Sequence, residues 1–206
     1  MVIHAMVNYP NGKKAISTPV QHNTYTARSK EKIGAGGRGM ELEKEINITN
    51  KYYLSTDRAV IHKKPTPVTI VHVDYPKRSA AKITEAYFKL PSTTDYNGIY
   101  RGKYIDFEAK DNMTTTSFPL KSIHSHQISH LEAVIRHGGI AFVIVRFVQR
   151  GETFFVPAKR MTNFYRTADR SSIPYDWFRL NGTLIPSSYT KPVDYLQIVD
   201  RLYFKD

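Results

Sequence analysis

The sequence predicts an α/β fold in which helices flank a mixed β-sheet. Helical and strand-like patterns alternate along the chain, the apolar run at residues 140–145 is typical of a strand buried on both faces, and residues 104–110 alternate apolar and polar side chains. The chain has 206 residues, of which 41% are hydrophobic and 12% are aromatic, so we expect one domain with a substantial core.

Residues 1–38 are predicted to form a flexible basic N-terminal arm. They contain six basic residues against one acid, together with Pro10, Asn11-Gly12, Pro19 and a glycine-rich segment at 34–37. An ordinary frayed terminus would have the same composition, so both interpretations stay open. Residues 39–206 are expected to form the main domain.

The main domain is predicted to begin with a helix at Gly39. Its apolar positions recur at helical spacing, and its first turn is acidic, which suits the positive end of the helix dipole. The positions concerned are Leu42, Ile46, Tyr53, Glu41 and Glu43. A short strand at 59–61 follows, and Pro65 and Pro67 then prevent regular structure, so the chain must change direction.

A hairpin with a basic tip is predicted next. Two β-rich runs, VTIVHVDY and KITEAYFKL, flank Pro76-Lys-Arg-Ser79. Residues 62–90 contain six Lys or Arg against two acids. Helix is the alternative for residues 79–88, because Ala80, Ala81, Lys82 and Glu85 favour it.

The second half of the chain continues the alternation of helix and strand. A helix is predicted over 126–137, with one apolar side and Gly138-Gly139 after its end. Two buried strands, GIAFVIVRFV and ETFFVPA, come next, followed by a short helix at 159–165. Residues 166–192 are predicted to be a turn-rich connection, and an amphipathic helix at 194–203 ends the chain.

The charge balance predicts a polyanionic partner. Thirty Lys and Arg against 18 Asp and Glu give a formal net charge of +12 and an isoelectric point near 9.7. Nucleic acid is the first expectation and an anionic membrane surface the second, but no apolar run is long enough to span a bilayer. The absence of cysteine excludes disulfides and thiolate metal sites, and with no apolar leader it predicts a cytoplasmic location.

Acids are concentrated at residues 93–110 despite this basic character. In the strand YIDFEAK, residues Ile105, Phe107 and Ala109 share one face, and the polar side chains share the other. The polar ones are Tyr104, Asp106, Glu108 and Lys110. On alternation alone, a half-buried strand with a solvated polar face is the simpler interpretation.

A turn predicted at Asn97-Gly98 changes that balance, because it would fold Glu108 back near Asp95. Two convergent carboxylates with Lys110 beyond the second suit a hard cation such as Mg²⁺. Bare acids would repel a phosphodiester, whereas a divalent cation between them reverses the local field. Lys110 could then offset charge on the phosphate, and the role of Asp106 stays open.

Asp95 and Glu108-Ala109-Lys110 resemble the D…(D/E)-x-K signature of restriction-endonuclease-like nucleases, and further segments are more specific. In this order they strongly resemble the RecU family of Holliday-junction resolvases over nearly the whole chain, most faintly at 160–192. The segments are NYPNGK at 8–13, GRGMELE at 37–43, AVIHKKPTP at 59–67, YPKRSAA at 75–81, STTDYNG at 92–98, YIDFEAK at 104–110, and SFPL plus HxHQxxH up to residue 130.

The resemblance implies a restriction-endonuclease-like nuclease domain at 39–206, with a protruding basic stalk at about 63–90. It implies a homodimeric crossover junction endonuclease that nicks a four-way DNA junction symmetrically in recombination and repair. The implied cofactor is Mg²⁺, with Mn²⁺ able to substitute. By the family motif the metal ligands are Thr93, Asp95, Glu108 and Gln127, the transition-state stabiliser is Lys110, and Glu43 is a further acidic site residue.

Gln127 also has a signal of its own. With Leu131 and Val134 it lies at i, i+4 and i+7, which turns it toward the core, where it would need a partner such as metal-bound water. Phosphate contacts are expected from the basic arm and hairpin, namely from Arg38, Lys63, Lys64, Lys77, Arg78 and Lys82. Contacts with a recombinase or a branch-migration protein, and a place near the nucleoid, are further expectations.

Three alternatives remain from the sequence. His124, His126 and His130 could form a zinc site, although no cysteine or clear carboxylate accompanies them. The chain could be a nucleic-acid-binding protein without catalysis, for which its charge alone would suffice. It could also be a related nuclease that cuts linear duplex DNA.

Overall fold

The computed structural model describes residues 40–89 and 93–204. The predicted arm at 1–38, and with it Arg38, lies outside these residues. Within them, no helix combines the length and the apolarity that a membrane crossing requires.

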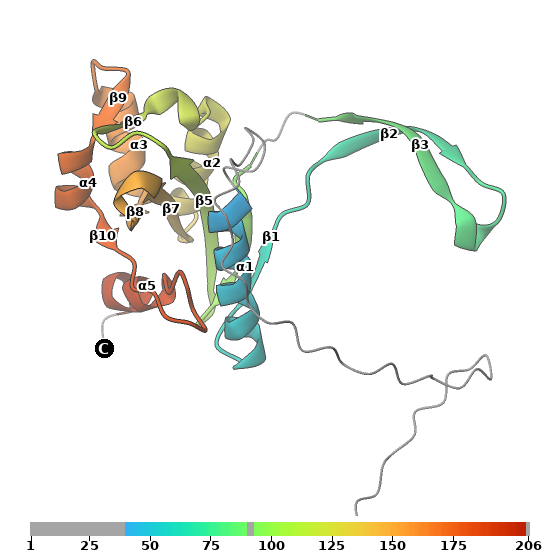
Figure 1. Cartoon of the computed structure of the whole chain (residues 1–206), viewed down its shortest axis with the longest axis horizontal. Coiled ribbons are helices and arrows are strands. Elements are labelled where there is room, and N and C mark those ends of the chain that lie inside the picture. Colours follow the sequence, from blue (N-terminus) through green and yellow to red (C-terminus); the bar gives the residue numbers. More distant parts are fainter. Residues whose placement is uncertain (1–39, 90–92, 205–206) are drawn as a thin grey trace, which may run out of the picture. The chain divides into compact units, whose positions relative to one another are not determined.

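A six-stranded mixed sheet forms the centre of the described chain, in the order β1-β4-β5-β7-β8-β10 (Figure 1). The strands are β1 (Val60–Lys63), β4 (Tyr96–Tyr100), β5 (Lys103–Asn112), β7 (Ile140–Phe147), β8 (Glu152–Pro157) and β10 (Thr183–Leu184). Strands β5 and β7 are parallel, and the other neighbours are antiparallel. The predicted mixed α/β fold is therefore confirmed.

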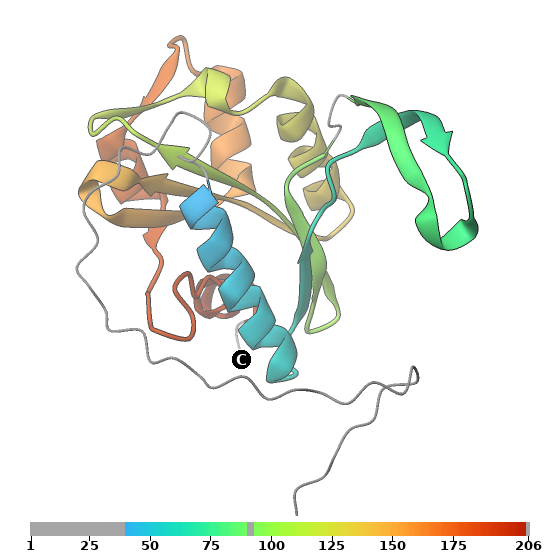
Figure 2. The ribbon, with the colours of Figure 1, turned by 45° about the vertical axis from the view of Figure 1, so that its right-hand side comes forward.

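Helices cover both faces of the sheet, and Figure 2 shows α1 in front of it with α2 and α3 behind. The helices are α1 (Met40–Ser55), α2 (Ser125–Arg136), α3 (Ala158–Thr167), α4 (Tyr175–Asn181) and α5 (Leu196–Tyr203). Successive residues of β7 point to opposite faces, so Phe142 packs on the side of α1 and α5, and Val143 on the side of α2, α3 and α4. This explains why residues 140–145 are continuously apolar.

The predicted hairpin is present as a separate two-stranded sheet. It consists of β2 (Val68–Asp74) and β3 (Lys82–Phe88), joined through a 3-10 turn at Arg78–Ala80. Every position in the two strands is exposed except Val73, which is half-buried. The alternative of a helix at 79–88 was wrong.

The prediction of a turn-rich connection at 166–192 was also wrong in part. This segment contains α4, β10 and a strand β9 (Ser172–Pro174), which pairs with β6 (Ser117–Pro119). Phe178 of α4 is fully buried in the core. The pairing joins strands more than fifty residues apart, so no local pattern could indicate it.

The turn before β5 lies four residues later than predicted. Asn97 and Gly98 are inside β4, and the chain reverses at Arg101 and Gly102, whose φ angles are 47° and 74°. Gly98 is required for another reason: a Cβ there would lie 2.1 Å from the carbonyl oxygen of Val60. The glycine therefore permits a close approach of β1 rather than a turn.

Candidate active site

The pairing of β4 with β5 brings Asp95 and Glu108 together, as predicted. Tyr96 is opposite Phe107, so Asp95 follows in register opposite Glu108. The backbone N–H of Asp95 donates to Glu108 Oε2 at 3.2 Å. The Glu108 carboxylate on β5 thus contacts the backbone of Asp95, just before β4.

Glu108 is fully buried, which raises the pKa of its carboxyl from 4.5 to about 8. Burial is the largest cause, and the charge of Asp95 adds to it. Lys110 acts in the opposite direction, with Nζ 2.6 Å from Glu108 Oε1. Asp106 is also fully buried, so the expectation of a solvated polar face on this strand was wrong.

The oxygen atoms at this point fit a divalent cation. Glu108 Oε1 is buried and no neutral donor of the described residues reaches it; its partner is the Lys110 ammonium, with Nζ at 2.6 Å. The pKa of Glu108 stays at about 8 with Lys110 in place, so this one ammonium does not fully offset burial and the charge of Asp95. Two carboxylates with threonine and glutamine oxygens are the ligands that hard cations prefer.

Five of the predicted catalytic and metal-binding residues line a hollow of about 610 Å³, whereas Glu108 is not part of its wall. Those on its wall are Glu43, Thr93, Asp95, Lys110 and Gln127. A smaller adjoining hollow of about 340 Å³ shares Glu43, Asp95 and Lys110. The structure therefore brings residues from α1, β5, α2 and the segment before β4 to one place.

Gln127 is buried, as its helical spacing predicted, but its oxygen already has a protein partner. Gln127 Oε1 accepts the backbone N–H of His124 at 3.0 Å, which caps the first turn of α2. A metal-bound water is therefore not needed to satisfy this oxygen. A buried Gln127 does need a partner, as predicted, and the backbone of His124 is one. Gln127 also lies on the wall of the hollow, as the family motif implies.

Two of the lysines expected to contact DNA are paired with acids. Lys63 Nζ lies 2.5 Å from Glu43 Oε2, and Lys64 Nζ lies 2.8 Å from Asp106 Oδ2. In the hairpin, Lys77 and Lys82 are exposed, and Arg78 lies in the tip turn. Among the described residues, no ion pair holds Lys77 or Lys82 in the way that Asp106 holds Lys64.

The three histidines do not form a zinc site. The rings of His124 and His126 stack with centroids 5.4 Å apart, while His130 Nε2 lies 3.1 Å from Asp106. Across residues 40–89 and 93–204, no group of three or more His, Cys, Asp or Glu side chains is arranged to hold a metal. Burial lowers the pKa of His126, and the charges of His124 and Lys110 lower it further.

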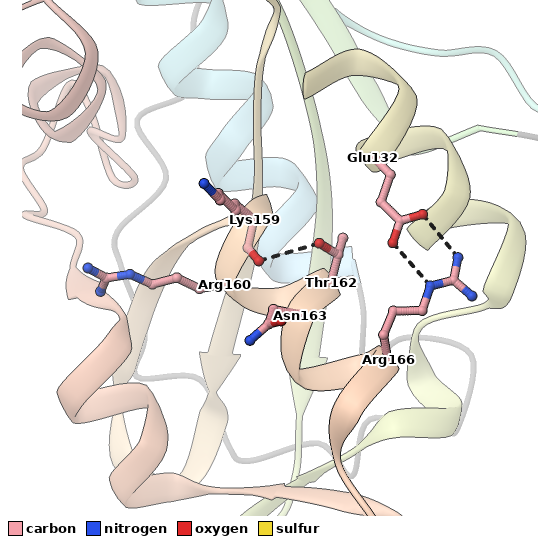
Figure 3. Close-up of a pocket in the computed structure, with 6 residues that line it drawn as sticks. All are labelled: Glu132, Lys159, Arg160, Thr162, Asn163 and Arg166. Carbon is pink, nitrogen blue, oxygen red and sulfur yellow. Dashed lines mark hydrogen bonds and ion pairs between the residues drawn. The ribbon is translucent and has the colours of Figure 1, made fainter. Parts of the chain in front are cut away.

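A separate hollow of about 660 Å³ lies between α2 and α3, and Figure 3 shows the residues that line it. Arg166 points across it to Glu132, with two contacts of 3.1 and 3.0 Å. Lys159, Arg160 and Asn163 also lie on its wall. The one acid on its wall, Glu132, is already paired with Arg166, so this hollow does not repeat the two-carboxylate arrangement of Asp95 and Glu108.

The fold and the site define a class: a mixed α/β protein in which a buried glutamate, Glu108, lies against Asp95 and Lys110, and these two residues line a hollow. A family model described as "RecU: Recombination protein U" matches residues 37–201. The chain belongs to the RecU family.

Curated relatives agree over nearly the full length. The chain is 53% identical to the Holliday junction resolvase RecU of Oceanobacillus iheyensis over 201 residues, covering 96% of this chain and 100% of that protein. It is 50% identical to the protein of the same name from Shouchella clausii, covering 96% and 95%. It also has a likeness to the solved Holliday junction resolvase Hjc of Archaeoglobus fulgidus, at 13% identity and a TM-score of 0.42, covering 71% and 95%.

Proposed function

We propose that this chain is a Mg²⁺-dependent endonuclease that resolves four-way DNA junctions by paired symmetric nicks. The observation that carries the proposal is the buried Glu108 carboxylate, held against the backbone of Asp95 beside Lys110. A protein that only binds DNA has no use for buried acids facing phosphate. Relatives named as Holliday junction resolvases, which match 95% or more of their own length, support the junction as substrate.

Asp95 and Glu108 would hold the cation, with oxygens of Thr93 and Gln127 completing the set. When bound, a divalent cation neutralises the acids, polarises the scissile phosphodiester and activates water for in-line attack. Glu108 must be ionised to act as a ligand, and its raised pKa means that cation and proton compete for it.

Lys110 would act on the phosphate. Its ammonium now lies against Glu108, where its positive charge lowers the pKa of that carboxyl. Once a cation holds Glu108, the same ammonium is available to stabilise charge that develops on the phosphate. Glu43 would have a supporting role, because it stands on the same wall and holds Lys63.

A homodimer suits this substrate. A four-way junction has approximate twofold symmetry, so two sites related by a twofold axis would cut at equivalent positions. A single site would leave a half-resolved product. The exposed hairpin, with Lys77 and Lys82, would supply phosphate contacts whose strength depends on salt. Work within recombination and repair in the cytoplasm, in contact with a recombinase or branch-migration protein, belongs to the same proposal.

The test compares three variants on a synthetic four-way junction and on linear duplex with Mg²⁺ present. Asp95→Asn and Glu108→Gln should each lower junction cleavage on the order of 100-fold or more, while junction binding persists. Glu132→Gln is the matched control, because it removes an acid from the separate hollow in Figure 3. Unchanged cleavage in either site variant would remove the proposed assignment, and equal cutting of linear duplex by the wild type would favour the other nuclease class.

A further inference from the structure

Asp106 is a buried acid that the proposed mechanism leaves unused. It is fully buried in β5, on the same strand face as Glu108. Four side chains reach its carboxylate: Lys64, Thr94, Tyr104 and His130. A buried carboxylate with several donors is held in one position, so whatever it contacts is held with it.

The first of these contacts fixes the backbone between two candidate ligands. Thr94 Oγ1 donates to Asp106 Oδ1, and Thr94 is itself buried. Its chain neighbours are Thr93 and Asp95, which both line the hollow. Holding Thr94 therefore restricts the positions that both neighbours can adopt.

A second contact reaches the helix that carries another candidate ligand. His130 Nε2 lies 3.1 Å from Asp106 Oδ2. His130 follows Gln127 by three residues on α2, so the two lie on neighbouring turns of one face. The same carboxylate is thus connected to the segment before β4, to α2 and, along its own strand, to Glu108.

Lys64 supplies the opposite charge. Its Nζ lies 2.8 Å from Asp106 Oδ2 and 3.0 Å from Thr94 Oγ1, and its side chain is only 18% exposed. Its backbone N–H also donates to the carbonyl oxygen of Asp95 at 2.7 Å. A buried carboxylate needs such a partner, and here that partner also contacts the chain on both sides of the Thr94–Asp95 peptide.

We propose that Asp106 is a positioning residue for cation binding, with Lys64 as its counter-ion. It holds the segments that carry Thr93, Asp95 and Gln127 in the arrangement that a cation requires, without being a ligand itself. This inference rests on the proposed function. Removing a group that orients metal ligands typically weakens metal binding by about 10- to 100-fold.

The experiment is a calorimetric titration of Mn²⁺ into the full-length chain without DNA. Asp106→Asn and Thr94→Val should each raise the Kd for Mn²⁺ by about 10- to 100-fold. Thr94→Val is nearly isosteric and removes one hydroxyl while leaving the Asp106–Lys64 pair in place. It therefore tests the inference even if Asp106→Asn does not fold.

Asp194 provides the matched control. It is also buried, accepts a hydrogen bond from Tyr53 at 2.7 Å, and pairs with a lysine, Lys191. Its partner Tyr53 belongs to α1, on the other side of the sheet from α2. Asp194→Asn should lower the free energy of unfolding yet keep the Kd for Mn²⁺ within about twofold.

Junction cleavage measured against Mn²⁺ concentration adds a second measurement. A positioning defect moves the midpoint of this curve and is relieved at high Mn²⁺, whereas a smaller folded fraction lowers the rate at every concentration. Wild-type Mn²⁺ affinity in both Asp106→Asn and Thr94→Val, or an equal loss in Asp194→Asn, would overturn the inference. Glu108→Gln separates the two proposals: if it loses both Mn²⁺ binding and junction cleavage while Asp106→Asn and Thr94→Val keep wild-type Mn²⁺ affinity, only this inference falls, and if the wild type binds no Mn²⁺, both fall.

Discussion

The hairpin β2–β3 and the strand pair β4–β5 are both antiparallel, yet their side chains lie in opposite environments. In β3 every residue is exposed, whereas Ile105 through Glu108 of β5 are all buried. The neighbouring elements explain the difference: β5 lies between β4 and β7, with α1 and α2 packed against it, whereas within residues 40–89 and 93–204 β2 and β3 pair only with each other.

The difference in burial suits the two strand pairs to different roles. Strand β5 gains a fixed position from its neighbours, which suits the proposed cation site at Asp95 and Glu108. The hairpin leaves large apolar and basic side chains in solvent, among them Phe88, Tyr87, Ile83 and Lys82. An isolated hairpin is at best marginally stable, and its exposed surface fits the contact with DNA that we propose.

The largest expected effect is a loss of stability on substitution in the buried strand pair β4–β5. Phe107 stacks on Tyr96 and Phe142, with centroids 4.8 and 4.7 Å away, and is fully buried. Phe107→Ala should lower the free energy of unfolding by about 3–5 kcal/mol, because it removes these contacts and leaves a cavity. Urea unfolding would measure the change, and a loss below about 1 kcal/mol would break the contrast between the two strand pairs.

The second effect is a pH dependence that burial of Glu108 creates. In the metal-free folded state its pKa is about 8, whereas its ordinary value is 4.5. Between these values the folded chain holds a proton that the unfolded chain has released, so the free energy of unfolding should fall as pH rises through this window. Glu108→Gln should remove this part of the slope in urea unfolding at several pH values, and an unchanged slope would contradict burial as its origin.

A third prediction compares the tips of the two strand pairs. Lys77→Gln with Lys82→Gln should weaken junction binding and make the plot of log affinity against log salt shallower by up to about 2, since each lost phosphate contact removes roughly 0.9. Lys103, exposed at the tip of β4–β5, is the matched control. All variants are made in a Glu108→Gln background, so that the junction is not cut during the binding measurement. An equal change in the salt dependence for Lys103→Gln would argue against a special role of the hairpin.

The smallest effect is expected from an apolar hairpin residue. Ile83 is 51% exposed, so Ile83→Ala should change the free energy of unfolding by no more than about 0.5 kcal/mol. Thermal unfolding would detect a larger loss. Such a loss would mean that the hairpin is covered in solution, for example by a second copy of the chain.

The sequence predicted well those features that depend on local pattern. The helices α1 and α2, the buried strand β7 and the exposed hairpin follow from periodicity and turn residues. The meeting of Asp95 with Glu108 was also predicted, although from a turn placed at Asn97-Gly98 that is really at Arg101 and Gly102. A turn at Asn97-Gly98 would have placed Asp95 opposite Tyr100, so the later turn is what places Asp95 opposite Glu108.

Features that depend on distant contacts could not be predicted in this way. Strand β9 pairs with β6 across more than fifty residues, and alternation gave no sign that α2 would bury Asp106 and Glu108. The partners of Asp106 come from four separate places in the sequence, residues 64, 94, 104 and 130. Its position two residues before Glu108 was the one available signal.

Because Gly98 has no side chain, β4 and β1 can lie close together at this point. Any larger residue would press on the Val60 carbonyl and on Ile61, and would push β1 away from its neighbour. The end of β1 leads directly to Lys63 and Lys64, which are bound to Glu43 and Asp106. The absence of a side chain at Gly98 thus allows β1 to lie close enough for the ammonium groups of Lys63 and Lys64 to reach Glu43 and Asp106.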